Sequence, residues 1–172
     1  MTFKTPNGQI IGNHISYCLQ IKSESPELKI HVGTDSVYRS GTIWYIEVIV
    51  FRYGNSGAKY IYRKSSLPGF KKSDGKPDIF TKLWTEAKLT IALAKELREY
   101  LPVDVIEFDY NDLPEHLSNQ LVHATKGWAL AEGFCVMYKP EIFESPYTLI
   151  RDSYRPRTLL AAKAADHICQ TI

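Results

Sequence analysis

The sequence predicts an α/β protein with a five-stranded mixed sheet, helices on the faces of the sheet, and the element order β-β-β-α-β-α-β-α. Three β-rich segments follow one another with short turns between them. Helical segments then alternate with two further β-rich segments, and an alanine-rich helical segment comes last. A meander followed by β-α-β crossovers gives a mixed sheet covered by helices.

The first three strands are predicted at residues 29–35, 42–51 and 58–64, which are rich in β-branched and aromatic residues. A turn is predicted at 36–41, and Gly54-Asn-Ser-Gly57 indicates a hairpin between the second and third strands. Short turns favour antiparallel pairing of these three strands.

The second half of the chain alternates helices and strands. We predict a helix at 78–101, ended by Pro102, then a strand at 103–109, a helix at 117–132 with Gly133 as its C-cap, a strand at 134–138, a long connection at 141–156 and a helix at 158–169. In the first of these helices, one broad apolar face is expected from Ile79, Leu83, Ala87, Thr90, Ile91, Leu93, Ala94 and Leu97.

A chain of 172 residues is expected to form a single domain. Within it, residues 1–28 are predicted to be an N-terminal arm and short helix, and residues 29–172 the main domain. The arm is expected to be irregular over residues 1–12, and Asn13 is the candidate N-cap of a helix over residues 13–22.

Composition describes an ordinary globular protein, with 44% hydrophobic and 23% charged residues. The net charge of +2 does not identify a partner. We expect no membrane association, since no apolar stretch approaches the roughly 20 residues that span a bilayer and no signal peptide is evident. The widely spaced Cys18, Cys135 and Cys169 are expected to be reduced. A cytoplasmic location is predicted.

Glu86 breaks the pattern of its helix, because its helical angle places it within the apolar face. A core-facing carboxylate costs several kcal/mol unless it is paired or binds metal. The structural alternative is a boundary Glu that pairs with a Lys or Arg.

Asp35 and Asp109 are each predicted at the end of a strand, and Asp166 lies among alanines in the last helix. Each has an ordinary alternative. The first two could form turns, and Asp166 could be a solvated neighbour of Lys163.

Taken together, the four carboxylates predict a metal site. Adjacent central strands would place Asp35 beside Asp109, while helices packed on the sheet could add Glu86 and Asp166. Four such charges would raise one another's pKa unless cations intervene. Oxygen ligands select Mg²⁺ or Mn²⁺, and two ions could clamp the reacting oxygens of a phosphoryl displacement.

The arrangement resembles the ribonuclease H-like fold, and more closely the YkuK-like family of predicted ribonuclease H-related proteins. The matching stretches run from Lys29 to His167. They include Val32-Gly-Thr-Asp-Ser36, Tyr60-Ile-Tyr-Arg-Lys64, Thr85-Glu86, Phe108-Asp-Tyr-Asn111, Ser118-Asn119, Gly133-Phe134, Lys139-Pro140 and Ala164-Ala-Asp-His167.

The resemblance implies that Asp35, Glu86, Asp109 and Asp166 are the catalytic and metal-binding residues. The segment after Lys139-Pro140 is longer than the family pattern, so Asp152 competes with Asp166 as the fourth ligand. Candidate supporting residues are Ser36, Asn119, Lys139 and His167; His167 could assist proton transfer or simply pack on its helix face. Two basic groups could contact phosphate or be solvated surface: Lys71, Lys72 and Lys76, and Arg151, Arg155 and Arg157.

These residues predict a divalent-metal-dependent nuclease that acts on RNA, an RNA–DNA hybrid or DNA through a two-metal site. The alternative is a non-catalytic module of the same fold that binds nucleic acid or protein. An ATP-using relative is disfavoured, since Gly33-Thr-Asp-Ser36 is a poor match to a glycine-rich phosphate loop.

Overall fold

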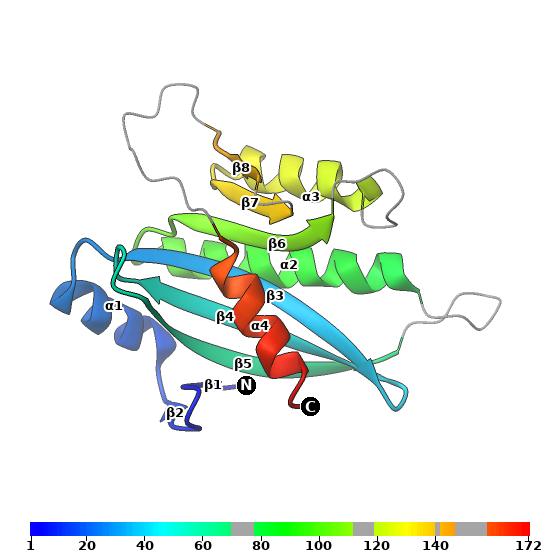
Figure 1. The fold of residues 1–172 in the computed structure, drawn as a ribbon, viewed down its shortest axis with the longest axis horizontal. Helices are drawn as coiled ribbons and strands as arrows, with labels where there is room; N and C mark the ends of the chain where they lie inside the picture. The colour runs from blue at the N-terminus through cyan, green and yellow to red at the C-terminus, as the bar shows by residue number, and fades with distance from the viewer. Residues whose placement is uncertain (70–77, 112–118, 140–141, 147–157) are drawn as a thin grey trace.

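The computed structural model describes residues 1–69, 78–111, 119–139, 142–146 and 158–172 (Figure 1). The strands in these residues form one mixed sheet. Its strand order is β2-β1-β5-β4-β3-β6-β7-β8. In chain order the strands are β1 (Phe3–Lys4), β2 (Ile10–Ile11), β3 (Lys29–Arg39), β4 (Thr42–Arg52), β5 (Ala58–Pro68), β6 (Val105–Asn111), β7 (Val136–Lys139) and β8 (Ile142–Glu144).

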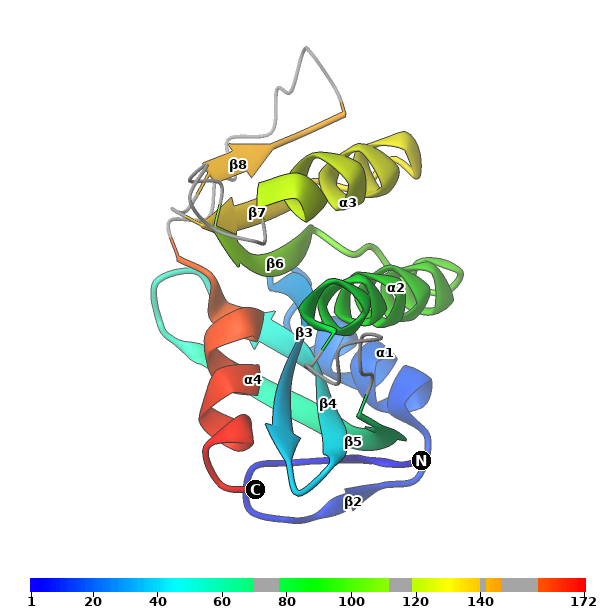
Figure 2. The ribbon, with the colours of Figure 1, turned by 90° about the vertical axis from the view of Figure 1, so that its right-hand side faces the viewer.

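Four helices in the described residues cover the two faces of the sheet: α1 (His14–Glu24), α2 (Ile79–Arg98), α3 (Asn119–Ala131) and α4 (Leu160–Cys169). Figure 2 shows α4 alone on one face, with α1, α2 and α3 on the other. The predicted order of the strands at β3, β4, β5, β6 and β7 and of the helices between and after them is confirmed, and so is the mixed α/β class.

The sheet has eight strands, so the prediction of five is wrong. The additional strands β1, β2 and β8 contain only two or three residues each, too few to show an alternating pattern. They form because the sheet offers them open edges: β1 pairs with β5, and β8 pairs with β7. Residues 1–12 therefore hold two short strands, where an irregular arm was expected.

β3 is the centre of the fold, antiparallel to β4 and parallel to β6. It does not end at Asp35, as predicted, but continues to Arg39, where Arg39 pairs with Thr42. The turn is only Ser40–Gly41, with φ of 49° and 79°. Two residues with positive φ form the tight hairpin whose twist matches the strands, so the predicted turn at 36–41 is also wrong.

Two other strand ends differ from the predictions. β5 continues to Pro68, past the predicted end at residue 64, because its pairing with β4 extends to Thr42. β6 extends to Asn111, two residues beyond Asp109. Both carboxylates that were predicted to close strands therefore lie within them.

The helix signals were accurate. The Asn13 side chain accepts a hydrogen bond of 2.9 Å from the Ser16 N–H at the start of α1. Gly133, with φ of 85°, follows α3, and the next N–H, from Phe134, bonds to the Ala129 carbonyl at 3.0 Å. One position of the predicted apolar face of α2 is wrong, because Ile79 lies in the first turn and is 42% exposed.

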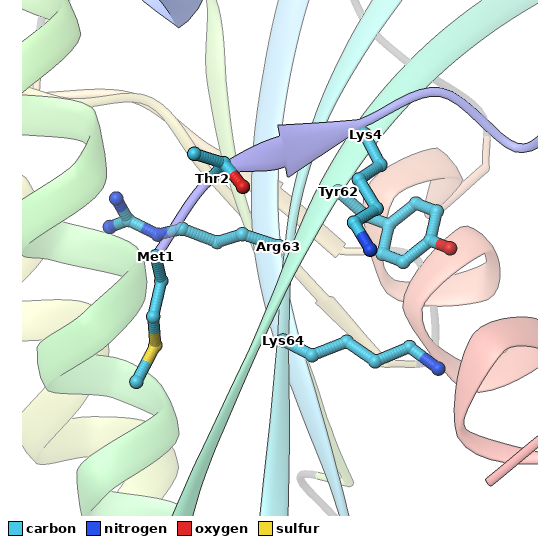
Figure 3. Close-up of a pocket in the computed structure, with 6 residues that line it drawn as sticks. All are labelled: Met1, Thr2, Lys4, Tyr62, Arg63 and Lys64. Atoms are coloured by element: carbon cyan, nitrogen blue, oxygen red, sulfur yellow. The ribbon is translucent and has the colours of Figure 1, made fainter. Parts of the chain in front are cut away.

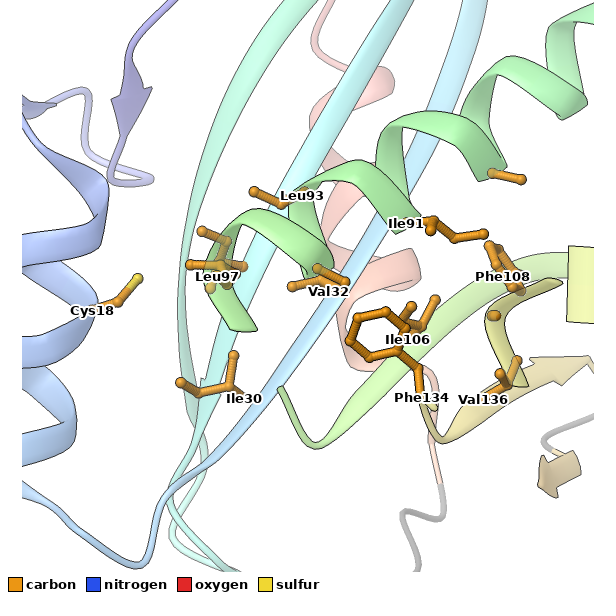
Figure 4. Close-up of a cluster of buried hydrophobic side chains, with 14 of the residues drawn as sticks. Cys18, Ile30, Val32, Ile91, Leu93, Leu97, Ile106, Phe108, Phe134 and Val136 are labelled. Atoms are coloured by element: carbon orange, nitrogen blue, oxygen red, sulfur yellow. The ribbon is translucent and has the colours of Figure 1, made fainter. Parts of the chain in front are cut away.

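The larger core lies between the sheet and α1, α2 and α3. Figure 4 shows Leu93 and Leu97 of α2 close to Ile30 and Val32 of β3. On the other face, α4 packs through Ala161, Ala165, Ile168 and Cys169 on Ile46, Val48 and Val50 of β4. The three cysteines are free thiols in the structure, and none of the described helices is long and apolar enough to cross a membrane.

Candidate active site

The candidate site lies where β3 and β6 run side by side between α2 and α4. The register of β3 and β6 aligns Gly33 with Glu107. Asp35 lies two positions after Gly33, and Asp109 lies two positions after Glu107. Because side chains alternate between the two faces along a strand, Asp35 and Asp109 both point to the α4 face of the sheet. Adjacent parallel strands thus present two carboxylates at neighbouring positions, as expected from the sequence.

Asp35 is half-buried, and its Oδ1 accepts a hydrogen bond of 2.7 Å from the Ser36 N–H. Burial raises the pKa of Asp35, and the charges of Asp109 and Asp166 raise it further, against the lowering effect of the Ser36 N–H and Lys82. Asp35 is therefore within electrostatic reach of carboxylates from both a neighbouring strand and the last helix.

Glu86 faces the interior, as predicted, with only 2% of its surface exposed. Its Oε1 accepts a hydrogen bond from the Ser36 hydroxyl and another of 3.1 Å from Lys82 Nζ. Burial raises the pKa of Glu86 to about 7, and the Asp35 charge adds to this, while Lys82 and Ser36 act in the opposite direction. The pairing with Lys82 also matches the structural alternative raised from the sequence.

Asp109 and Asp166 have other partners. Asp109 forms an ion pair with Lys139, the last residue of the adjacent strand β7. Asp166 is exposed on α4 and accepts a hydrogen bond of 3.0 Å from Gln170 Nε2. Among the residues that the structure describes, no three or more His, Cys, Asp or Glu side chains are close enough together to hold a metal ion.

The four carboxylates are thus neighbours without forming a closed cage of ligands. Their donor atoms are all carboxylate oxygens, which suit a hard divalent cation. Burial is the main cause of the raised pKa values of Asp35 and Glu86, and neighbouring carboxylates raise both values further. The chemistry of the donor set therefore fits Mg²⁺ or Mn²⁺, although the side chains are not preassembled.

The supporting candidates have different places. Ser36 joins the two acidic groups, since its N–H donates to Asp35 and its hydroxyl to Glu86. Lys139 neutralises Asp109, and His167 is exposed next to Asp166. Asn119 is the first residue of α3.

Several predicted contacts lie outside the described residues. These are Asp152 as the competing fourth ligand, and the two basic groups Lys71, Lys72 and Lys76, and Arg151, Arg155 and Arg157.

Glu107 and His31, which the sequence pattern did not predict as site residues, form a buried pair, and Glu107 fixes the position of α4. His31 Nδ1 lies 2.6 Å from Glu107 Oε1, and both side chains are fully buried. Glu107 Oε2 accepts hydrogen bonds of 2.7 and 3.1 Å from the backbone N–H groups of Ala161 and Ala162. A carboxylate at a helix N-terminus satisfies unpaired N–H groups and the helix dipole, so Glu107 of β6 caps α4 from a distance.

α4 also lies very close to β3. A Cβ added to Gly33 would lie 3.1 Å from Ala161 Cβ and 3.3 Å from the Ala162 nitrogen. The small alanine side chains of α4 permit this close approach to the sheet. The contact and the Glu107 cap together place Asp166 on the same face as Asp35.

Two signals in the sequence could have identified the missed residues. Glu107 and His31 each interrupt an apolar strand, by the same reasoning that singled out Glu86. Lys82 lies four positions before Glu86, the spacing at which a Lys reaches a Glu on a helix.

Comparison with known proteins gives one match. Residues 13–148, most of the chain, match a family model described as ribonuclease H-like. No curated protein and no solved structure shows a significant match.

Proposed function

The chain belongs to the ribonuclease H-like family, and on this basis we propose that it is a divalent-metal-dependent nuclease acting on phosphodiester bonds of RNA or DNA. The observation that carries the proposal is the electrostatic neighbourhood of Asp35. A half-buried carboxylate on the central strand has its pKa raised by burial and by two further carboxylates, Asp109 and Asp166. A carboxylate with a raised pKa that lies close to other acidic side chains is typical of functional sites.

In this proposal, Asp35, Glu86, Asp109 and Asp166 hold Mg²⁺ or Mn²⁺. The bound cations supply positive charge that stabilises in-line displacement at a phosphodiester. Asp35 has a central position, since it is the group on which the charges of Asp109 and Asp166 both act.

The lysines have a complementary role. Lys82 and Lys139 neutralise Glu86 and Asp109 in the structure. When a cation takes over that charge, either ammonium group is free to turn to a phosphate oxygen of the substrate. A lysine acts there as a point charge, and this needs no fixed geometry.

The test is cleavage of labelled RNA, RNA–DNA hybrid, single-stranded DNA and branched DNA with Mg²⁺ or Mn²⁺. We expect Asp35→Asn to lower the rate on the preferred substrate at least about 100-fold, a barrier increase of about 3 kcal/mol. Glu27→Gln is the matched control, because Glu27 is an exposed carboxylate before the opposite end of β3. The proposal fails if wild type cuts no substrate, or if Asp35→Asn cuts as fast as the control.

A second candidate function is a non-catalytic module that binds nucleic acid or protein. It is favoured by the pairing of Glu86 and Asp109 with lysines, which stabilises both carboxylates without metal. This candidate predicts binding that needs no divalent cation and survives Asp35→Asn, together with no cleavage in the same assay.

A further inference from the structure

The α4 face of the sheet is only partly covered by α4. Residues directly opposite each other in antiparallel strands point to the same face, and the register of β3, β4 and β5 gives three such rows on the α4 face. Gly33, Val48 and Tyr62 form one row, Asp35, Ile46 and Lys64 the next, and Val37, Trp44 and Ser66 the third. Val48 and Ile46 pack under α4, so the third row lies beyond them, toward the Ser40–Gly41 turn.

Trp44 is the large side chain of that third row. It is half-buried, and it belongs to none of the hydrophobic clusters in the described part of the chain. Its opposite neighbour on β5, Ser66, is exposed and small. Trp44 lies one row from Asp35, and the exposed part of its side chain is an aromatic surface on which a flat partner can stack.

Three basic residues lie on the same face of the sheet as Trp44. Lys64 is in the same row as Asp35 but two strands from it, on β5. At the usual strand spacing the backbones at these two positions are about 10 Å apart. Arg39 lies on β3 two positions past Val37 and is exposed. Lys4 is opposite Tyr62 on β1, the strand between β5 and the edge strand β2.

Figure 3 shows Lys4, Tyr62 and Lys64 extending to the side of the sheet where α4 lies, whereas Arg63 extends the other way. Arg63 is held there by two hydrogen bonds of 2.8 and 2.7 Å to Glu47. The lysines line a cavity of about 340 Å³ together with Met1, Thr2, Tyr62 and Arg63. Lys64 Nζ lies 5.9 Å from the centre of the Tyr62 ring.

We propose that this surface, the Trp44 face (Arg39, Trp44, Lys64, Ser66 and Lys4), binds a single-stranded nucleic acid. One base stacks on Trp44, and the phosphates on either side contact Lys64 and Arg39, with Lys4 extending the path across β5. The inference rests on the proposed function, because it supplies the substrate class for the site at Asp35. Single strands fit better than duplexes, since a base must be unstacked before it can lie on an indole ring.

Charge supports this choice of partner. The Trp44 face carries three cations, while Asp35 lies on β3 at the opposite end of the row that contains Lys64, within electrostatic reach of Asp166. A polyanion is drawn to the cationic side, and its chain then passes next to Asp35. Sequence-tolerant single-strand binders combine such a basic path with an aromatic ring.

The direct test measures the binding of short labelled oligouridylate and oligothymidylate by fluorescence anisotropy, in a buffer that contains EDTA. We expect Trp44→Ala to weaken binding about 5- to 150-fold, and Trp44→Phe to retain most of the affinity. We expect Lys64→Ala to lower the slope of log affinity against log salt by about 0.7. Lys88→Ala is the matched control, because Lys88 is exposed on α2 on the opposite face, and it should leave both quantities unchanged.

A second readout uses the intrinsic fluorescence of Trp44. In the double variant Trp84→Phe/Trp128→Phe, Trp44 is the remaining tryptophan of the three in the chain. We expect its emission to be quenched by oligothymidylate. An unquenched Trp44, or Trp44→Ala and Lys64→Ala that both bind like Lys88→Ala, overturns the proposal. So does equal affinity for a duplex of the same sequence.

The outcomes separate this proposal from the nuclease proposal. Binding through Trp44 in EDTA without any cleavage in Mn²⁺ supports the Trp44 face and contradicts the nuclease. Cleavage that requires Asp35 but is unaffected by Trp44→Ala contradicts the Trp44 face alone.

Discussion

Glu86 shows how a single residue can couple folding to pH. Burial raises its pKa to about 7, so between about pH 4.5 and 7 the folded state holds a proton that the unfolded state has released. The unfolded state binds fewer protons in this range, and the free energy of unfolding therefore falls as pH rises. At low pH the protonated side chain has no charge to bury.

We predict that Glu86→Gln removes this dependence. The variant should resemble wild type at pH 5 and be more stable at pH 8, by up to about 3 kcal/mol. Urea unfolding in EDTA at the two pH values measures the difference. Glu99→Gln, at the exposed end of the same helix, should follow wild type at both. The prediction would be contradicted if the difference in free energy of unfolding between Glu86→Gln and wild type did not increase from pH 5 to pH 8.

At the scale of elements, the contact between α4 and β3 decides where Asp166 lies. Gly33 has no room for a methyl group, because the nearest atoms include the Ala162 nitrogen and the Glu107 carbonyl oxygen, both in the backbone. Flexible side chains could move aside, whereas backbone atoms of a capped helix and a central strand cannot do so cheaply. The element as a whole has to shift.

We therefore predict that Gly33→Ala destabilises the protein by about 1–3 kcal/mol. The same substitution at Gly127, within α3, should stabilise it by about 0.5–1 kcal/mol, because an added Cβ meets no atom within 4 Å there and alanine favours the helix. Chemical denaturation of both variants measures the two effects. Equal changes in the free energy of unfolding of the two variants would show that the backbone freedom of glycine, and not contact with α4, determines the effect of the substitution at Gly33.

The Glu107 cap belongs to the same scale. It connects β6 to the start of α4 across 54 positions of sequence, and its second oxygen holds His31 of β3. Three elements of the site are thus tied by one carboxylate. Breaking a buried pair of this kind leaves an uncompensated polar group, which is more costly than the pair is stabilising.

At the scale of the whole molecule, the proposed metal site makes stability depend on divalent cations. A ligand that binds only the folded state stabilises it by RT ln(1 + [L]/Kd), or about 2.7 kcal/mol at a concentration 100 times Kd. The carboxylates of the site come from β3, β6, α2 and α4, so a bound cation would join elements from both faces of the sheet.

We predict that Mn²⁺ raises the melting temperature, and raises it more at pH 8 than at pH 6. The pKa values of Asp35 and Glu86 are both raised, so protons compete with the cation more strongly at the lower pH. Differential scanning fluorimetry with and without Mn²⁺ measures the shift. Asp35→Asn should abolish most of it, and Glu27→Gln should not. A shift that is equal in both variants would place the cation elsewhere.

The sequence by itself determined the long elements and the identity of the acidic residues. β-branched and aromatic runs specify β3, β4 and β5, while Asn13 and Gly133 specify a helix start and a helix end. These signals act over a few residues, so they can be read locally. Glu86 could be identified for the same reason, since helical periodicity alone places it among apolar neighbours.

Tertiary structure decided where strands end and what each acidic group contacts. β3 runs past Asp35 because β4 pairs with it as far as Thr42, and β1 forms because β5 offers an open edge. The partners of Asp109 and Glu107 lie 30 or more positions away in sequence or on separate elements. Such pairings are selected by the free energy of the assembled sheet and its helices, and no local pattern encodes them.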